Sequence, residues 1–168
     1  DKACKPINVM GMTKAIQERI FIESNLSTPD TSFVCVRYGN VLASRGSVLP
    51  LFKEQIRTGG PVTITLKEMT RFLLTLNQAV DTIFAAVHGA NMGETYVPKA
   101  PAARILDVAK VLIGEKGTPI EFSGVRPGEK VHEILVSEDE VPRTTERDGY
   151  YIIHPIIPEL SLKIAKPA

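Results

Sequence analysis

Short β-branched runs alternate with longer segments of helical periodicity along most of this chain, and that alternation is the strongest constraint on its fold. Apolar residues recur at helical spacing in four segments, and compact apolar runs separate them. The predicted helices are about 8–24, 46–60, 75–89 and 103–115, and the predicted strands are 32–39, 61–65, 94–98 and 119–124. Strands that alternate with helices predict an α/β protein with parallel strand pairing.

Two of the predicted helices carry further detail. Pro50 should lie in the first turn of the helix at 46–60, where its missing N–H costs nothing, and Gly59-Gly60 should end that helix. The helix at 75–89 should be amphipathic, with Ala79, Ile83, Ala86 and Val87 on one side.

The last third of the chain is different in character. Residues 127–136 predict a turn followed by a short helix, which Glu129 and Lys130 would begin. Residues 137–168 are first charged, then apolar and rich in Pro. We expect this C-terminal arm to be irregular and to pack on a neighbouring surface, such as that of another subunit.

Composition excludes several classes of protein. With 168 residues, 43% of them hydrophobic, and a formal net charge of +1, the chain is typical of a soluble globular domain rather than of a nucleic-acid or membrane-surface binder. No apolar run reaches the roughly 18 residues of a membrane span. Cys4, Cys35 and the three histidines have no metal-ligand spacing, so we expect no metal site. The two cysteines predict reduced thiols in a cytoplasmic protein, although they could also pair with each other.

An Asp and a Lys stand together at the start of the chain, before a helix that carries a second Lys. Asp1-Lys2 and Lys14 could supply a general acid and a general base if their surroundings lower the pKa of a Lys. The alternative is a solvated charged pair in front of an ordinary helix. The chain opens at Asp1 without Met or a signal peptide, so we expect it to be part of a longer protein.

A Gly-containing stretch, RYGNVLASRGSVLP at 37–50, offers groups that suit an anionic ligand. Gly allows a close backbone approach, Asn40 offers hydrogen bonds, and Arg45 offers a fork for phosphate. Ser47 opens a helix, and a helix N-terminus attracts anions. The alternative is a loop that only caps the helix.

Two more arginines stand where packing alone would not require them. Arg71 lies between Met69 and Phe72, both predicted for the core, so its guanidinium must reach solvent or an anion. Arg126 lies on a turn framed by Gly and Pro, a suitable place to bind a diphosphate. Each could equally be an ordinary exposed Arg.

Five ordered motifs within residues 1–136 identify a resemblance: DKACKPINVMGMTK, RYGNVLASRGSVLPLF, EMTRF, YVPKAPAARI and VRPGEKVHEIL. Together they resemble the extended short-chain dehydrogenases/reductases that act as nucleotide-sugar 4,6-dehydratases. The similarity is greatest to the UDP-N-acetylglucosamine 4,6-dehydratases of bacterial polysaccharide biosynthesis, which are lyases and include an inverting, capsule-type branch that also epimerises C5.

The resemblance implies the back half of an extended Rossmann-type fold with a small α/β substrate domain. Residues 1–60 would end the NAD(P)-binding domain, residues 61–136 would form the substrate domain, and residues 137–168 would form the arm. The cofactor would be NADP or NAD. Because the Gly-rich phosphate-binding turn of the family is absent from this sequence, we expect the chain alone to be inactive.

The resemblance also implies catalytic roles. Lys14 would hold the cofactor ribose, Asp1 would protonate the leaving C6 hydroxyl, and Lys2 would remove the C5 proton. Met10 occupies the place of the family's Tyr, four residues before Lys14, and capsule-type members have Met there. The C4 hydroxyl proton would therefore pass to Lys2 or to Ser/Thr residues upstream of Asp1.

The binding roles carry over by motif. Tyr38 and Val41 would lie near the nicotinamide, and Asn40 would contact the cofactor and the sugar or its phosphate, beside Arg45 and Ser47. Val62 and Thr63 would contact uracil through their backbone groups. Arg71 and Arg126 would bind the diphosphate, and Glu129 would lie at the ribose.

Two other functions stay open at this level. A UDP-sugar 4-epimerase is one, although Asp1-Lys2 beside Lys14 suits a dehydratase better. A non-catalytic fragment that binds a nucleotide sugar is the other. The expected partners are a UDP-N-acetylhexosamine substrate and further copies of the chain in a homo-oligomer such as a hexamer, with no nucleic acid and no membrane for this chain.

Overall fold

The computed structural model describes residues 2–44 and 46–160, and its contacts divide the chain into two compact units. The first unit contains residues 2–38, 77–99 and 134–160 of the described chain, and the second contains residues 39–44, 46–76 and 100–133. Both units are thus interleaved in sequence, which differs from the three consecutive segments that we expected. The assignment of those segments to cofactor and substrate binding stays a prediction.

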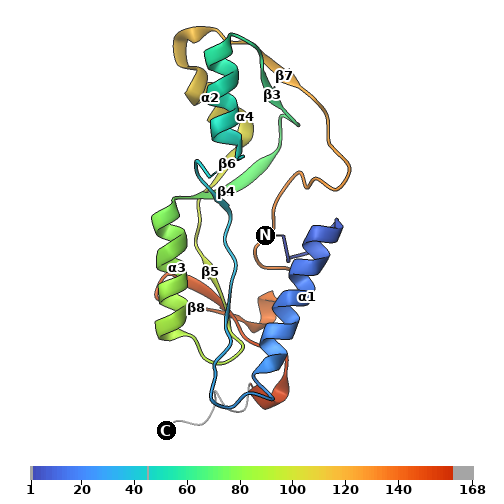
Figure 1. Cartoon of the computed structure of the whole chain (residues 1–168), viewed down its shortest axis with the longest axis vertical. Helices are drawn as coiled ribbons and strands as arrows, with labels where there is room; N and C mark the ends of the chain where they lie inside the picture. Colours follow the sequence, from blue (N-terminus) through green and yellow to red (C-terminus); the bar gives the residue numbers. More distant parts are fainter. Residues whose placement is uncertain (1, 45, 161–168) are drawn as a thin grey trace. The chain divides into compact units, whose positions relative to one another are not determined.

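The first unit is built on a four-stranded sheet with the strand order β1-β5-β9-β8. Its strands are β1 (Cys35–Val36), β5 (Thr95–Pro98), β8 (Thr144–Arg147) and β9 (Tyr150–Ile153). β1 and β5 are parallel, whereas the β5–β9 and β9–β8 pairs are antiparallel. Figure 1 shows helices α1 (Val9–Ser24) and α3 (Leu76–Gly89) on either side of β5, and a 3-10 helix, η2 (Val141–Arg143), precedes β8.

The second unit contains two smaller sheets. β2 (Asn40–Val41), β4 (Thr70–Leu74) and β6 (Ala102–Arg104) form one, with β2–β4 parallel and β4–β6 antiparallel, and the parallel pair β3 (Val62–Ile64) and β7 (Ile120–Phe122) forms the other. The helices are α2 (Val48–Thr58), α4 (Ile105–Ile113) and the 3-10 helix η1 (Gly114–Lys116).

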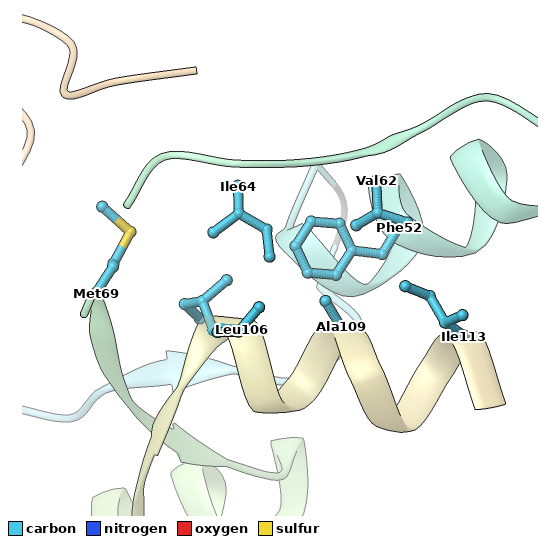
Figure 2. Close-up of a cluster of buried hydrophobic side chains, with 8 residues drawn as sticks. Phe52, Val62, Ile64, Met69, Leu106, Ala109 and Ile113 are labelled. Atoms are coloured by element: carbon cyan, nitrogen blue, oxygen red, sulfur yellow. The ribbon is translucent and has the colours of Figure 1, made fainter. Parts of the chain in front are cut away.

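Helix α2, helix α4 and strand β3 enclose the core of the second unit. Figure 2 shows the ring of Phe52 from α2 pointing toward Ile64 of β3 and Ala109 of α4. Phe52 and Ala109 are fully buried. The small Ala109 side chain lets the two helices approach, so this layer of side chains holds β3 in place.

Most of the predicted helices and strands are confirmed by this structure. α1, α2, α3 and α4 fall within the four predicted segments, and Pro50 lies in the first turn of α2. Two of the parallel pairs, β1–β5 and β3–β7, join predicted strands, whereas the third, β2–β4, uses a strand at Thr70–Leu74 that was not predicted. The fold is therefore mixed α/β, with antiparallel pairs that the alternation of elements did not predict.

Three expectations about local structure are wrong. The first concerns residues 127–136, which form turns and bends and no helix. The Thr70 N–H donates to the Val131 carbonyl at 3.2 Å, and Arg71 donates to the carbonyls of Lys130 and Val131 at 2.8 and 3.0 Å. Because these carbonyls bond to β4, they are not free for helical hydrogen bonds.

The second concerns the arm. Residues 144–153 form the β8–β9 hairpin, which extends the sheet of the first unit rather than forming an irregular segment. Asp148 and Gly149 both have positive φ, 50° and 84°, as a two-residue type I′ turn requires. The Asp-Gly pair between two short strands was the sequence signal for this hairpin.

The third concerns the buried side of α3. Ala79, Thr82 and Ala86 are buried, whereas Ile83 and Val87 are 43% and 66% exposed. The small side chains let the helix lie close to the sheet, and the Thr82 hydroxyl donates to the Gln78 carbonyl within the helix. Packing therefore selects the small residues over the larger apolar ones.

Within the part of the chain that the structure describes, no helix is long and apolar enough to cross a membrane.

Candidate functional site

The segment that contains Lys2 packs against the first turns of α1. A Cβ on Gly11 would lie 2.7 Å from the Lys2 carbonyl oxygen and 2.9 Å from the Pro6 Cβ, so only Gly fits there. Gly11 lies between Met10 and Lys14 in α1. The structure therefore brings the backbone of Lys2 to the helix turn that carries these two residues, and Figure 1 shows the N-terminal segment beside that end of α1. Asp1 lies outside the described residues.

Lys2, Met10 and Lys14 all have exposed side chains, and Met10 is 58% exposed. The Lys14 ammonium donates to Gln17 Oε1 at 3.1 Å, one turn further along α1. Asn8 is the N-cap residue of this helix, and its side-chain oxygen accepts the Gly11 N–H at 2.8 Å, which satisfies one of the free donors of the first turn. A capped, exposed helix end presents these side chains to a ligand.

Farther along α1, a buried cluster of charges surrounds Arg37, which is 3% exposed. Its guanidinium donates to both carboxylate oxygens of Glu18 at 2.6 and 2.8 Å and to both of Glu140 at 2.8 Å. Glu140 also accepts from the backbone N–H and hydroxyl of Ser137 at 2.9 and 3.0 Å.

Burial and hydrogen bonding act in opposite directions on these groups. Burial raises the pKa of Glu140, but the hydrogen bonds from Arg37 and Ser137 outweigh it, and the pKa falls from 4.5 to about 2. Burial lowers the pKa of Arg37, and the bonds to Glu18 and Glu140 raise it by more. Glu140 and Arg37 therefore both stay ionised near neutral pH. Sequence reasoning missed this cluster, although an Arg directly after a buried apolar strand was a signal for it.

The residues predicted around the sugar and nicotinamide divide between the two units. Tyr38 is half-buried in the first unit, whereas Asn40 and Val41 form β2 of the second unit and pair with Leu73 and Leu74 of β4. Ser47 is the N-cap residue of α2. Its hydroxyl is buried and has no hydrogen-bond partner among residues 2–44 and 46–160. Arg45 lies outside these residues.

Val62 and Thr63, predicted to contact uracil, already have partners for their backbone N–H groups. The Val62 N–H donates to the Pro119 carbonyl at 2.8 Å, and the Thr63 N–H donates to Gln55 Oε1 at 3.1 Å. Gln55 also donates to the Thr63 hydroxyl at 2.8 Å. A base that used the Thr63 N–H would have to displace Gln55.

Arg71 and Glu129 lie near each other, whereas Arg126 is exposed on its turn. The Arg71 guanidinium donates to backbone carbonyls and stands 4.0 Å from Glu129 Oε1. The Thr65 hydroxyl donates to the same oxygen at 3.3 Å, while Glu129 Oε2 is buried without a partner among the described residues. The hydrogen bonds of Arg71 thus go to the protein's own backbone, and Glu129 keeps an oxygen that could accept a hydroxyl.

No group of three His, Cys, Asp or Glu side chains in the described chain is arranged to hold a metal ion. The groups present are ammonium, guanidinium, carboxylate and backbone amides, which suit proton transfer and the binding of phosphates and hydroxyls.

Comparison with known proteins gives a consistent result. The family model described as Polysaccharide biosynthesis protein matches residues 1–155. An uncharacterized membrane protein of Methanocaldococcus jannaschii is 43% identical over 92% of this chain and 50% of its own length. The capsular polysaccharide biosynthesis protein CapD of Staphylococcus aureus is 48% identical over 84% of this chain and 24% of its own length. A UDP-glucose 4-epimerase of Rickettsia typhi is 44% identical over 91% of this chain and 46% of its length. The chain thus spans half or less of each of these relatives.

Solved structures confirm the fold class. The X-ray structure of Pen from Bacillus thuringiensis matches with a TM-score of 0.85 and 38% identity, over 92% of this chain and 50% of that one. A dTDP-glucose 4,6-dehydratase from Bacillus anthracis in complex with NAD matches with a TM-score of 0.65 and 15% identity, over 80% of this chain and 44% of that one. The chain has the Rossmann-like α/β fold of the short-chain dehydrogenases/reductases over about half the length of these structures.

Proposed function

Because this chain belongs to the polysaccharide biosynthesis protein family, we propose that the whole protein is a nucleotide-sugar 4,6-dehydratase that acts on UDP-N-acetylglucosamine, with epimerisation at C5. The observation that carries the proposal is the contact of the Lys2 backbone with Gly11. This contact brings the Lys2 backbone to the turn of α1 that carries Lys14. Met10 lies in the same turn and has no proton to transfer, so the acid–base group must be another residue. The similarity to the capsular protein CapD of Staphylococcus aureus supports the same reading.

In this proposal the nicotinamide cofactor, NADP or NAD, would accept a hydride from C4 of the sugar and return it to C6. The exposed Lys14 ammonium, with three N–H donors, fits the hydroxyls of a cofactor ribose. Lys2 would remove the C5 proton, which the C4 ketone makes acidic, and Asp1 would protonate the leaving C6 hydroxyl. A positioned acid or base of this kind typically contributes roughly 10² to 10⁴ in rate.

The nucleotide would bind residues of the second unit. The exposed Arg126 and the guanidinium of Arg71 would attract the diphosphate, and Glu129 Oε2 would accept a ribose hydroxyl. Asn40, Arg45 and Ser47 would contact the sugar and its phosphate, and Tyr38 and Val41 the nicotinamide. Thr63 and Val62 would contact the uracil, for which the Thr63 N–H is open only when Gln55 moves.

A second candidate is a UDP-sugar 4-epimerase. The observation in its favour is the 44% identity to a Rickettsia typhi protein that carries that name. An epimerase returns the hydride to C4 and needs no base at C5. The base that we assign to Lys2 therefore separates the two candidates.

The test is to incubate the whole protein with UDP-N-acetylglucosamine and NADP⁺ or NAD⁺ in deuterated water and to follow the sugar by NMR. A dehydratase gives a 4-keto-6-deoxy product with deuterium at C5. An epimerase gives the C4 epimer without deuterium at C5, and that result would replace our proposal. No turnover of UDP-N-acetylglucosamine would contradict the proposed dehydratase.

Two variants test the roles within that assay. Lys2→Met should abolish product and stop deuterium from entering C5, with a loss of roughly 10² to 10⁴ in rate. Met10→Ala should cost much less, because Met offers packing and no proton. If Lys2→Met keeps normal exchange at C5, the base is another residue.

A further inference from the structure

Every N–H donor of Arg37 has a partner. A guanidinium carries five N–H donors. Two go to Glu18, two go to Glu140, and the fifth goes to the carbonyl of Leu135 at 2.9 Å. This set fixes the position of Arg37 in all directions, because a planar fork bonded on every side can neither rotate nor slide without breaking a bond.

Arg37 joins three parts of the first unit. It follows directly after β1, which pairs with β5, so its backbone is anchored in the sheet. Glu18 belongs to α1, and Glu140 lies 103 residues away from Arg37, in the segment that leads to β8. The guanidinium therefore fixes helix α1 at one position along its axis relative to the sheet.

The position of α1 along its axis determines where the first turns of the helix lie. Glu18 is four residues after Lys14, so the two side chains are neighbours on one side of the helix. An α-helix is rigid over such a distance, with a rise of about 1.5 Å per residue. A shift of α1 at Glu18 would therefore move Lys14 and Gly11 equally, and with Gly11 the Lys2 segment that packs on it.

Stability alone does not explain such a cluster. Removing three charges from water is costly, and apolar side chains of similar size often give equal or greater stability. Apolar packing, however, tolerates a sliding helix, whereas two bidentate ion pairs do not. A buried cluster that costs desolvation and fixes one geometry indicates a requirement for position.

We propose that Arg37 is a positioning residue, which holds α1 at the position along its axis that places Lys14 and Lys2 for the reaction. The consequence for catalysis rests on the function proposed above. The consequence for α1 itself does not, because it concerns the protein without substrate.

The test compares Arg37→Met with Arg147→Met in the whole protein. Arg147 is a matched control, since it also binds a buried carboxylate in the first unit, that of Glu94 at 2.9 and 3.0 Å, while its hydrogen bonds within the described residues go to Glu94, Gly89 and Tyr96 rather than to α1. We expect Arg37→Met to lower kcat by roughly 10- to 100-fold with KM within threefold, because a misplacement of about 1 Å can cost that much. Arg147→Met should leave kcat within threefold. Equal losses of kcat in the two variants would show that Arg37 is only structural.

The conservative variant sharpens the test. Arg37→Lys keeps the charge between Glu18 and Glu140 but has three donors instead of five, so it should restore most of the thermal stability and leave kcat at least fivefold low. Full recovery of kcat would show that charge alone suffices and would overturn the proposal. If Arg37→Met does not fold, Glu18→Gln takes its place, because it loosens α1 while Glu140 still neutralises Arg37.

Hydrogen exchange without substrate separates this proposal from the proposed function. In Arg37→Met or Glu18→Gln, amides in the first turns of α1 should exchange at least tenfold faster than in the wild type, and in Arg147→Met they should not. A wild type without turnover would contradict the proposed function only. Unchanged exchange in α1 would contradict the positioning role.

Discussion

The side-chain amide of Gln55 covers the backbone of Thr63 in the way that a neighbouring strand would. Its oxygen accepts the Thr63 N–H at 3.1 Å, and its nitrogen donates to the Thr63 hydroxyl at 2.8 Å. Gln55 belongs to α2, so the helix satisfies an edge of β3 that has no further strand beside it in the described sheet. This edge is the one that we propose for the uracil.

Replacing Gln55 should therefore have two effects. Gln55→Leu leaves the partly buried Thr63 N–H without its partner, which should lower the free energy of unfolding by about 1 to 3 kcal/mol in urea titrations. If the base binds the Thr63 N–H, the variant should also bind UDP more tightly, as calorimetry would show, because nothing has to be displaced. Lys53→Ala, on the exposed side of α2, is the control and should change neither quantity. Weaker binding of UDP by Gln55→Leu would indicate that Gln55 itself contacts the nucleotide.

Gly11 should reverse the usual preference for Ala in a helix. Gly→Ala in a helix interior ordinarily stabilises by up to about 1 kcal/mol. At Gly11 the new Cβ would meet the Lys2 carbonyl oxygen at 2.7 Å, so we expect Gly11→Ala to destabilise by about 1 to 3 kcal/mol and to lower kcat. Gly60→Ala has nothing within 4 Å of its Cβ and should be tolerated. A stabilised and fully active Gly11→Ala variant would show that the Lys2 segment does not pack on α1.

Stability should depend on pH through Glu140. The pKa of this buried carboxyl is about 2 in the folded protein, against an ordinary 4.5, so its contribution is complete above about pH 5 and is lost as the pH falls toward 2. The advantage of the wild type over Glu140→Gln should therefore be roughly 3 kcal/mol larger at pH 6 than at pH 2, measured by urea unfolding. A difference that does not change with pH would contradict the ion pairs with Arg37.

Arg126 should serve binding rather than chemistry. Its exposed guanidinium would meet a diphosphate whose charge changes little during the reaction, and a charge-assisted contact is worth about 1.5 to 3 kcal/mol. Arg126→Ala in the whole protein should raise KM about tenfold or more with little change in kcat. Arg57→Ala removes another exposed Arg, one paired with Glu54 on α2, and should leave KM unchanged. A fall in kcat at constant KM would contradict the assignment to the diphosphate.

The local elements of this protein could be predicted from its sequence, because periodicity and turn residues act over a few neighbours. Apolar spacing located α1 to α4, Pro50 marked the first turn of α2, and the alternation of elements indicated parallel pairing, as in β1–β5 and β3–β7. The Asp148-Gly149 turn could also have been predicted from the Asp-Gly pair, although the charged residues around it had suggested an irregular arm. Strand β9 of this hairpin pairs with β5, because the backbone groups of a strand need hydrogen-bond partners and β5 formed an edge of the sheet.

Only the tertiary structure decided which charged groups lost their water and which partners they found. Arg37 stands 19 residues from Glu18 and 103 from Glu140, and Arg71 bonds to carbonyls about 60 residues away. In sequence the apolar neighbours of these two arginines suggest burial but do not reveal their partners, because periodicity describes the neighbours along the chain and not those that folding brings together. A guanidinium that is removed from water must bond to carboxylates or carbonyls, and the tertiary fold determines which of these groups lie within reach.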